Sequence, residues 1–191
     1  QYNTFVDKNS INHGEFGVHV LFNKKDGVIR NFIEDKQYDE IIKKSILNHN
    51  KDALYIPDDL TPRELLHTKI IRDSDKIDIL NLLTFEKKET AWEKADLSDD
   101  VISDEIYKEF MEQKRINYGH RKSSADVLVG HFAYVFDFNF PESLELVRER
   151  KYFEKIYNRF EFNNKDTMDK YKKIYKKVLE HIENTLQNAK I

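Results

Sequence analysis

Glycine and proline are scarce in this chain, which contains five glycines and three prolines in 191 residues. Sheets joined by tight turns usually need more of both, because glycine supplies positive φ angles and proline presets turn geometry. This shortage predicts an all-α protein.

The clearest single element is a long helix that begins at Thr61-Pro62-Arg63-Glu64 and runs toward Phe85. Thr61 can cap the helix, Pro62 suits its first position, and Glu64 stands where a capping box needs it. Neither glycine nor proline interrupts the stretch that follows. The helix carries the most informative part of the sequence, Lys69–Asp78.

Apolar residues at helical spacing predict further helices, at about 10–22, 36–49, 101–113, 125–138, 141–158 and 166–187. Ser10 is the expected cap of the first helix, and Asp99 or Asp100 that of 101–113. Residues 87–100 are polar and are expected to form a loop, in which Ala91-Trp92 can be partly buried. The last helix should place one stripe in the core, made of Met168, Tyr171, Tyr175, Val178, Ile182 and Leu186.

Length and composition predict one domain over residues 1–191 with a real core, because 39% of the residues are hydrophobic and 13% aromatic. The 32 basic and 35 acidic residues nearly balance. The chain therefore has no overall positive charge that would attract nucleic acid or an anionic membrane. No apolar run approaches the roughly 18 residues that span a bilayer.

The N-terminal Gln1-Tyr2-Asn3-Thr4 has neither an initiator methionine nor the pattern of a signal peptide, so an internal start is expected. The chain has no cysteine, which excludes disulfides, thiolate metal sites and a cysteine nucleophile. These features favour a cytoplasmic location.

Three polar groups could carry chemistry. His13, in His13-Gly-Glu-Phe-Gly17, can offer a ring nitrogen to a metal, or it can be an ordinary polar residue at a helix start. The second group is Asn48-His49-Asn50-Lys51, which can bind a metal together with a phosphate, or can simply end a helix.

The third group is Arg72-Asp-Ser-Asp-Lys76 with Asp78, in the middle of the long helix. Asp75 is expected at the edge of the buried stripe, where an unpaired carboxylate is costly and a metal or an ion pair would offset that cost. Arg72 and Lys76, four residues apart, could flank a phosphate. The alternative is a solvated face of mixed charge.

A combination of short stretches resembles the later two-thirds of an HD-type metal-dependent phosphohydrolase, most of all a bacterial group of uncharacterised HD-domain proteins. The stretches are Thr4–Asp7, Ser10–Val18, Gly27–Phe32, Ile46–Lys51, Lys69–Asp78, His131–Asn139 and Glu142–Arg150. The resemblance implies an HD-like helical bundle that lacks its first helices. Residues 1–86 would hold the metal-site portion and residues 87–191 the C-terminal helical portion.

Metal ligands in this family are a His, an adjacent His-Asp pair and a distant Asp, with two extra His in some members. By position, Asp75 matches the distant Asp, with Asp73 as the lesser alternative, and His13 and His49 match the extra His. The implied cofactor is a divalent ion (Mg, Mn, Fe, Co, Ni or Zn).

The departure from the family is that no His-Asp dipeptide occurs in this chain. In the family the pair lies just upstream of the stretch that resembles Gln1–Asp7. We therefore expect a truncated chain that binds metal weakly and is inactive, with an exposed apolar face that promotes homo-oligomers.

The implied activity is hydrolysis of a nucleotide or other small phosphate ester. Lys51, Arg72 and Lys76 are the candidate substrate phosphate-binding residues, Lys51 first among them. The alternative is a non-catalytic helical binding or regulatory domain. A third hypothesis, nucleic-acid binding through Arg115, His120, Arg121 and Lys122, is disfavoured by the net charge of −3.

Overall fold

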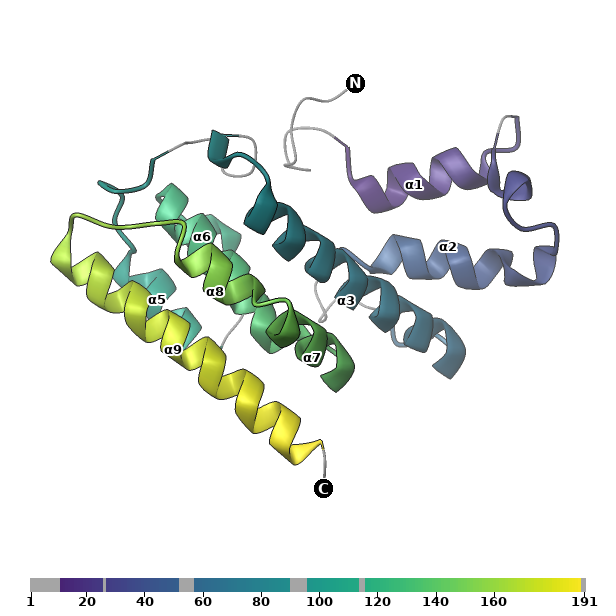
Figure 1. Ribbon diagram of the computed structural model, residues 1–191. Coiled ribbons are helices and arrows are strands. Elements are labelled where there is room, and N and C mark those ends of the chain that lie inside the picture. The colour runs from purple at the N-terminus through teal and green to yellow at the C-terminus, as the bar shows by residue number, and fades with distance from the viewer. Residues whose placement is uncertain (1–10, 26, 52–56, 90–95, 114–115, 190–191) are drawn as a thin grey trace. The chain divides into compact units, whose positions relative to one another are not determined.

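The computed structural model describes residues 11–25, 27–51, 57–89, 96–113 and 116–189 (Figure 1). Every regular element in these ranges is a helix, which confirms the all-α prediction. The longer helices are α1 (His13–Phe22), α2 (Asp39–Asn48), α3 (Pro62–Phe85), α5 (Asp104–Met111), α6 (Ser124–Phe132), α7 (Pro141–Glu149), α8 (Tyr152–Tyr157) and α9 (Lys165–Asn188). Short 3-10 turns are η2 (Ile29–Asn31), η3 (Lys36–Tyr38), η5 (Tyr118–His120) and η6 (Ala133–Asp137).

The chain divides into two compact units within α3. Unit 1 comprises residues 1–75 and unit 2 residues 76–191. None of the described helices combines the length and the apolar character needed to cross a bilayer.

The start of α3 has the predicted capping box. The Thr61 backbone N–H donates to Glu64 Oε2 at 2.8 Å, and the Glu64 N–H donates to Thr61 Oγ1 at 3.3 Å. Two orphan N–H groups of the helix are thereby satisfied. The helix then continues to Phe85, as the uninterrupted sequence predicts.

Helices α1 and α2 pack closely in unit 1 (Figure 1). Gly14 is buried at their contact, where a Cβ atom would lie 2.8 Å from the carbonyl oxygen of Ile46. Helix α1 begins at His13 and is capped by Asn12, whose Oδ1 accepts from the Glu15 N–H at 3.1 Å. Ser10, the expected cap, lies outside the described residues.

Helix α2 is joined to α3 by an ion pair. Lys44 Nζ lies 2.9 Å from Glu64 Oε1, and this hydrogen bond lowers the pKa of Glu64. Apolar burial in this unit is slight, because Ile29 is the one buried hydrophobic residue among the described residues of unit 1.

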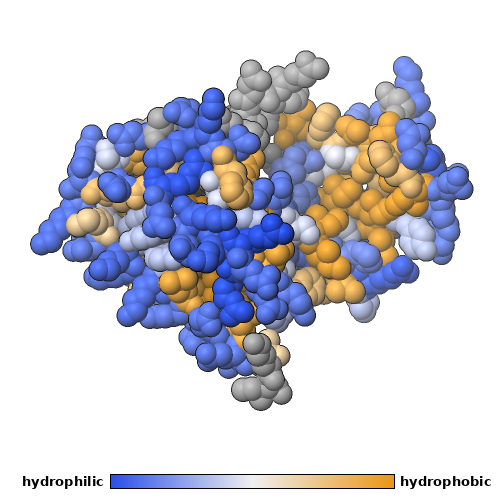
Figure 2. Space-filling view, viewed as in Figure 1, coloured by the Kyte–Doolittle hydropathy of each residue, from blue (hydrophilic) through white to orange (hydrophobic). Residues whose placement is uncertain are grey.

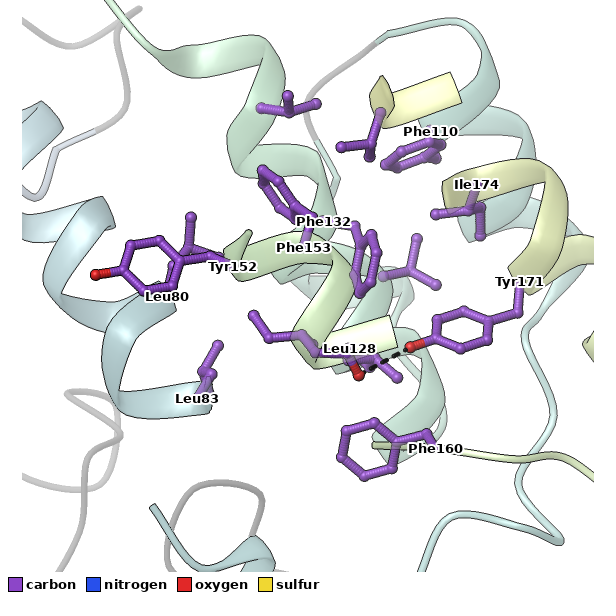
Figure 3. Close-up of a cluster of buried hydrophobic side chains, with 14 of the residues drawn as sticks. Leu80, Leu83, Phe110, Leu128, Phe132, Tyr152, Phe153, Phe160, Tyr171 and Ile174 are labelled. Carbon is purple, nitrogen blue, oxygen red and sulfur yellow. Dashed lines mark hydrogen bonds between the residues drawn. The ribbon is translucent and has the colours of Figure 1, made fainter. Parts of the chain in front are cut away.

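The hydrophobic core lies in unit 2 (Figure 3). Leu80 and Leu83 of α3 meet Phe132 of α6 and Phe153 of α8 there. Helix α9 packs along α5, α6, α7 and α8 and contributes a stripe, whose buried members are Tyr171, Ile174, Val178, Ile182 and Leu186. This confirms most of the predicted stripe, but Met168 is 50% exposed and does not belong to it.

Several predicted helices differ in their bounds. The stretch expected at 36–49 begins with the 3-10 turn η3 and becomes α-helical at Asp39. The helix expected at 101–113 begins at Asp104, with Ser103 at the cap position. Asp99 and Asp100 are used elsewhere: Asp99 accepts from Asn163 Nδ2 and Asp100 accepts from the Ala125 N–H. The two carboxylates that we expected to cap this helix therefore form hydrogen bonds with residues distant in the sequence instead.

The helix expected at 125–138 is α-helical only to Phe132 and then tightens into η6. Its N-cap is Ser123, whose Oγ accepts from the Asp126 N–H at 3.0 Å. The helix expected at 141–158 breaks into α7 and α8 at Lys151, which has a φ of 56°. Ala91-Trp92 lies outside the described residues.

Candidate metal centre

His13, His49 and Asp75 come together in unit 1. One potential ligand atom from each lies within 4.8 Å of the others. His13 comes from the first turn of α1, His49 from the C-cap of α2 and Asp75 from α3. The close contact of α1 with α2 at Gly14 places the first histidine beside the second.

The ring of His49 is held in one orientation. Its Nδ1 lies 2.6 Å from the carbonyl oxygen of Ile46, which can only accept, so Nδ1 carries the proton. In the neutral ring Nε2 therefore presents a lone pair. That Nε2 lies 2.9 Å from Nε2 of His13, and His49 is only 9% exposed.

The three residues fit a transition-metal ion. Two donors at right angles, each about 2.1 Å from an ion, lie roughly 3.0 Å apart, which is close to the 2.9 Å between the two imidazole nitrogens. Donors 4.8 Å apart need a small inward movement to reach such bond lengths. Two imidazoles with one carboxylate suit Zn, Fe, Co, Ni or Mn better than Mg or Ca, which prefer all-oxygen sites.

Three of the charged residues around Asp75 are buried, whereas Asp78 is exposed. Arg72, Asp73 and Lys76 are 3%, 2% and 7% exposed, so the alternative of a solvated face is wrong for these three residues. Asp75 is half-buried, at the edge of the buried stripe as expected. Asp73, the lesser candidate ligand, does not belong to the group formed with the two histidines.

The three candidate phosphate-binding residues have different surroundings. Arg72 Nη1 donates to the carbonyl oxygens of His49, at 3.2 Å, and of Lys51. Lys76 Nζ lies 3.0 Å from Asp137 Oδ2 within unit 2. Lys51 is exposed. The structure thus brings the three predicted metal ligands together and engages two of the three predicted phosphate-binding cations with protein oxygens.

The basic cluster after α5 is balanced by carboxylates. His120 Nδ1 lies 2.6 Å from Glu109 Oε1, and Lys122 Nζ lies 3.5 Å from Glu105 Oε2. The Arg121 guanidinium lies over Gly130, where a Cβ atom would be only 2.1 Å from it. Arg115 lies outside the described residues. These pairings give no support to nucleic-acid binding.

Sequence reasoning missed Asn12, which supports the site from α1. Its Oδ1 caps the helix that carries His13 and also accepts from Asn50 Nδ2 at 3.1 Å. The signal was present in Asn12-His-Gly-Glu15, where a capping residue precedes a glutamate by three positions.

Comparisons with protein-family models, with curated proteins and with solved structures give no match for this chain.

Proposed function

We propose that His13, His49 and Asp75 bind one divalent transition-metal ion, and that the chain derives from HD-type phosphohydrolases acting on a nucleotide or other small phosphate ester. The supporting observation is the convergence of three side chains from three helices to within 4.8 Å. The fixed His49 ring adds a preorganised donor.

Three protein ligands leave coordination positions open for water or substrate, as in catalytic rather than structural metal sites. When bound, such an ion supplies Lewis acidity toward a phosphate ester and activates water near neutral pH. Among the candidate phosphate-binding residues, exposed Lys51 stays the first choice. Arg72 and Lys76 are engaged with protein oxygens.

A non-catalytic metal-binding domain is the second candidate function. The absence of a His-Asp dipeptide favours it, because the chain lacks the pair that the resembled enzymes use. Since this chain by itself is expected to be inactive, the test that separates the two is hydrolysis of p-nitrophenyl phosphate and of nucleoside phosphates, measured with Mn²⁺ or Co²⁺ on the protein together with any coding sequence upstream of Gln1. Metal binding without turnover would favour the binding domain.

Replacing Asp75 with alanine is expected to lower Co²⁺ affinity at least about 100-fold, because the one carboxylate donor of the site is lost. The measurement is Co²⁺ titration followed by visible absorption, with elemental analysis of the dialysed protein. Asp78→Ala is the matched control, since Asp78 is an exposed aspartate one turn further along α3. Equal metal content in wild type and Asp75→Ala would refute the site.

Self-association is expected through apolar side chains of unit 1. Figure 2 shows orange surface gathered over the helices of this unit. Large hydrophobic residues exposed there are Ile11, Phe16, Val20, Phe32, Leu66 and Ile70. Pairs four residues apart lie on one face of their helix, Phe16 with Val20 on α1 and Leu66 with Ile70 on α3.

Light scattering should therefore show a mass that rises with protein concentration. The double variant Phe16→Ser/Val20→Ser should shift the chain toward the monomer. Met168→Ser/Leu179→Ser, which changes exposed apolar residues of unit 2, is the control and should leave the mass unchanged. A monomeric wild type at high concentration would contradict this prediction.

A further inference from the structure

Arg72 is a buried cation on the same helix as Asp75, three residues before it. Its Nη1 donates to the carbonyl oxygens of His49 and Lys51, which follow the end of α2. Carbonyls at a helix C-terminus have no partner within the helix, and a cationic donor satisfies them well. The guanidinium thus joins α3 to the backbone that carries the second histidine.

His49 is held at two places. Its ring donates to the Ile46 carbonyl through Nδ1 at 2.6 Å, and its own carbonyl accepts from Arg72 at 3.2 Å. The first contact sets which ring nitrogen is free. The second sets where the backbone of His49 stands relative to α3, and so to Asp75.

We propose that Arg72 is the positioning residue of the metal centre, acting through His49 rather than on substrate phosphate. This inference rests on the proposed metal site. The guanidinium uses Nη1 for two carbonyls and is only 3% exposed, so it offers almost no surface to a phosphate in solution. Partners that orient a ligand typically change metal affinity by about 10–100-fold when they are removed.

The first test is Co²⁺ affinity in Arg72→Met and Arg72→Lys. Both variants are expected to bind about 10–100-fold more weakly, with Arg72→Lys the milder, because an ammonium lacks the planar fork of a guanidinium. Lys44→Met is the matched control. It breaks a different link between α2 and α3, the pair with Glu64, and should change Co²⁺ affinity less than about twofold.

A double-mutant cycle decides whether Arg72 acts through His49. In a His49→Ala background, Arg72→Met should have almost no further effect on Co²⁺ affinity. In a His13→Ala background it should keep its full effect, since His13 lies on a different helix. Equal effects in the two backgrounds, or an unchanged affinity in Arg72→Met alone, would overturn the inference.

The position of the His49 ring relative to Asp75 provides a readout without metal. Nuclear Overhauser contacts between the His49 ring and the Asp75 side chain should be seen in the metal-free wild type and in Lys44→Met, and should weaken in Arg72→Met, while the Nδ1–H tautomer set by Ile46 is kept in all three proteins. Unchanged contacts in Arg72→Met would count against the inference. If the wild type binds no cation at all, the proposed function fails, while this measurement still decides the role of Arg72.

Discussion

Replacing Phe132 with alanine should lower the free energy of unfolding of unit 2 by about 3–5 kcal/mol, the usual cost of removing a buried phenylalanine. Phe132 is fully buried, and its ring centroid lies 5.5 Å from that of Phe153 and 5.6 Å from that of Tyr171 (Figure 3). Removal of the ring eliminates contacts with both α8 and α9. The surrounding helices cannot easily move to close the resulting cavity, because they are closely packed against one another.

Phe32→Ala is the control for this prediction. Phe32 is 75% exposed in unit 1, and its loss should change stability by less than about 0.5 kcal/mol. Urea titrations followed by circular dichroism and by the aromatic NMR signals of unit 2 would measure both variants. Comparable losses in the two variants would contradict the assignment of the core to α6, α8 and α9.

Much of the fold could be predicted from the sequence because its signals are local. The capping box at Thr61 and Glu64 and the Ser123 cap involve residues three apart, and such contacts form wherever those residues begin a helix. The apolar stripe of α9 has a helical period. Such elements need no knowledge of distant partners.

Helix breaks and rival partners could not be predicted, since they depend on tertiary packing. Lys151 adopts a left-handed conformation between two good helix-forming stretches. Asp100 accepts from the N–H of Ala125, 25 residues later in the first turn of α6, instead of capping α5. Neither feature can be predicted from the neighbouring residues in the sequence.

The candidate site shows the same division. Residue types and positions singled out His13, His49 and Asp75 one by one, but only the family resemblance joined them into one site, because spacing alone does not tell that three helices bring them together. The partners of Arg72 are backbone carbonyls more than twenty positions earlier. Carbonyl oxygens carry no side-chain signature, so the sequence offered Arg72 only as a cation that could bind phosphate.

Acid should destabilise unit 2 through His131. Its Nδ1 is enclosed although part of the residue reaches the surface. Burial, followed by the charge of Arg121, lowers the pKa of His131 from 6.5 to about 3. Between these two pKa values the unfolded chain binds a proton at His131 that the folded chain does not. The contribution of His131 to stability is therefore fully present above pH 6.5 and falls as the pH drops toward 3.

The slope of the free energy of unfolding against pH approaches about 1.4 kcal/mol per pH unit for one such group. The free energy of unfolding of unit 2 should therefore fall by roughly 1–2 kcal/mol between pH 6.5 and pH 5. Urea titrations at half-unit pH steps measure this loss, and His131→Gln should remove most of it. Glu64 and Asp104 have lowered pKa values, so the stability that they contribute is lost only at more acidic pH.

His181 in α9 is the histidine to compare, because burial also lowers its pKa. His181→Gln should leave the larger part of the slope in place, since the ring is less enclosed than that of His131. An unchanged slope in His131→Gln, or a slope removed by His181→Gln alone, would show that the proton enters unit 2 elsewhere. The slope separates this effect from a uniform loss of packing, which lowers stability equally at every pH.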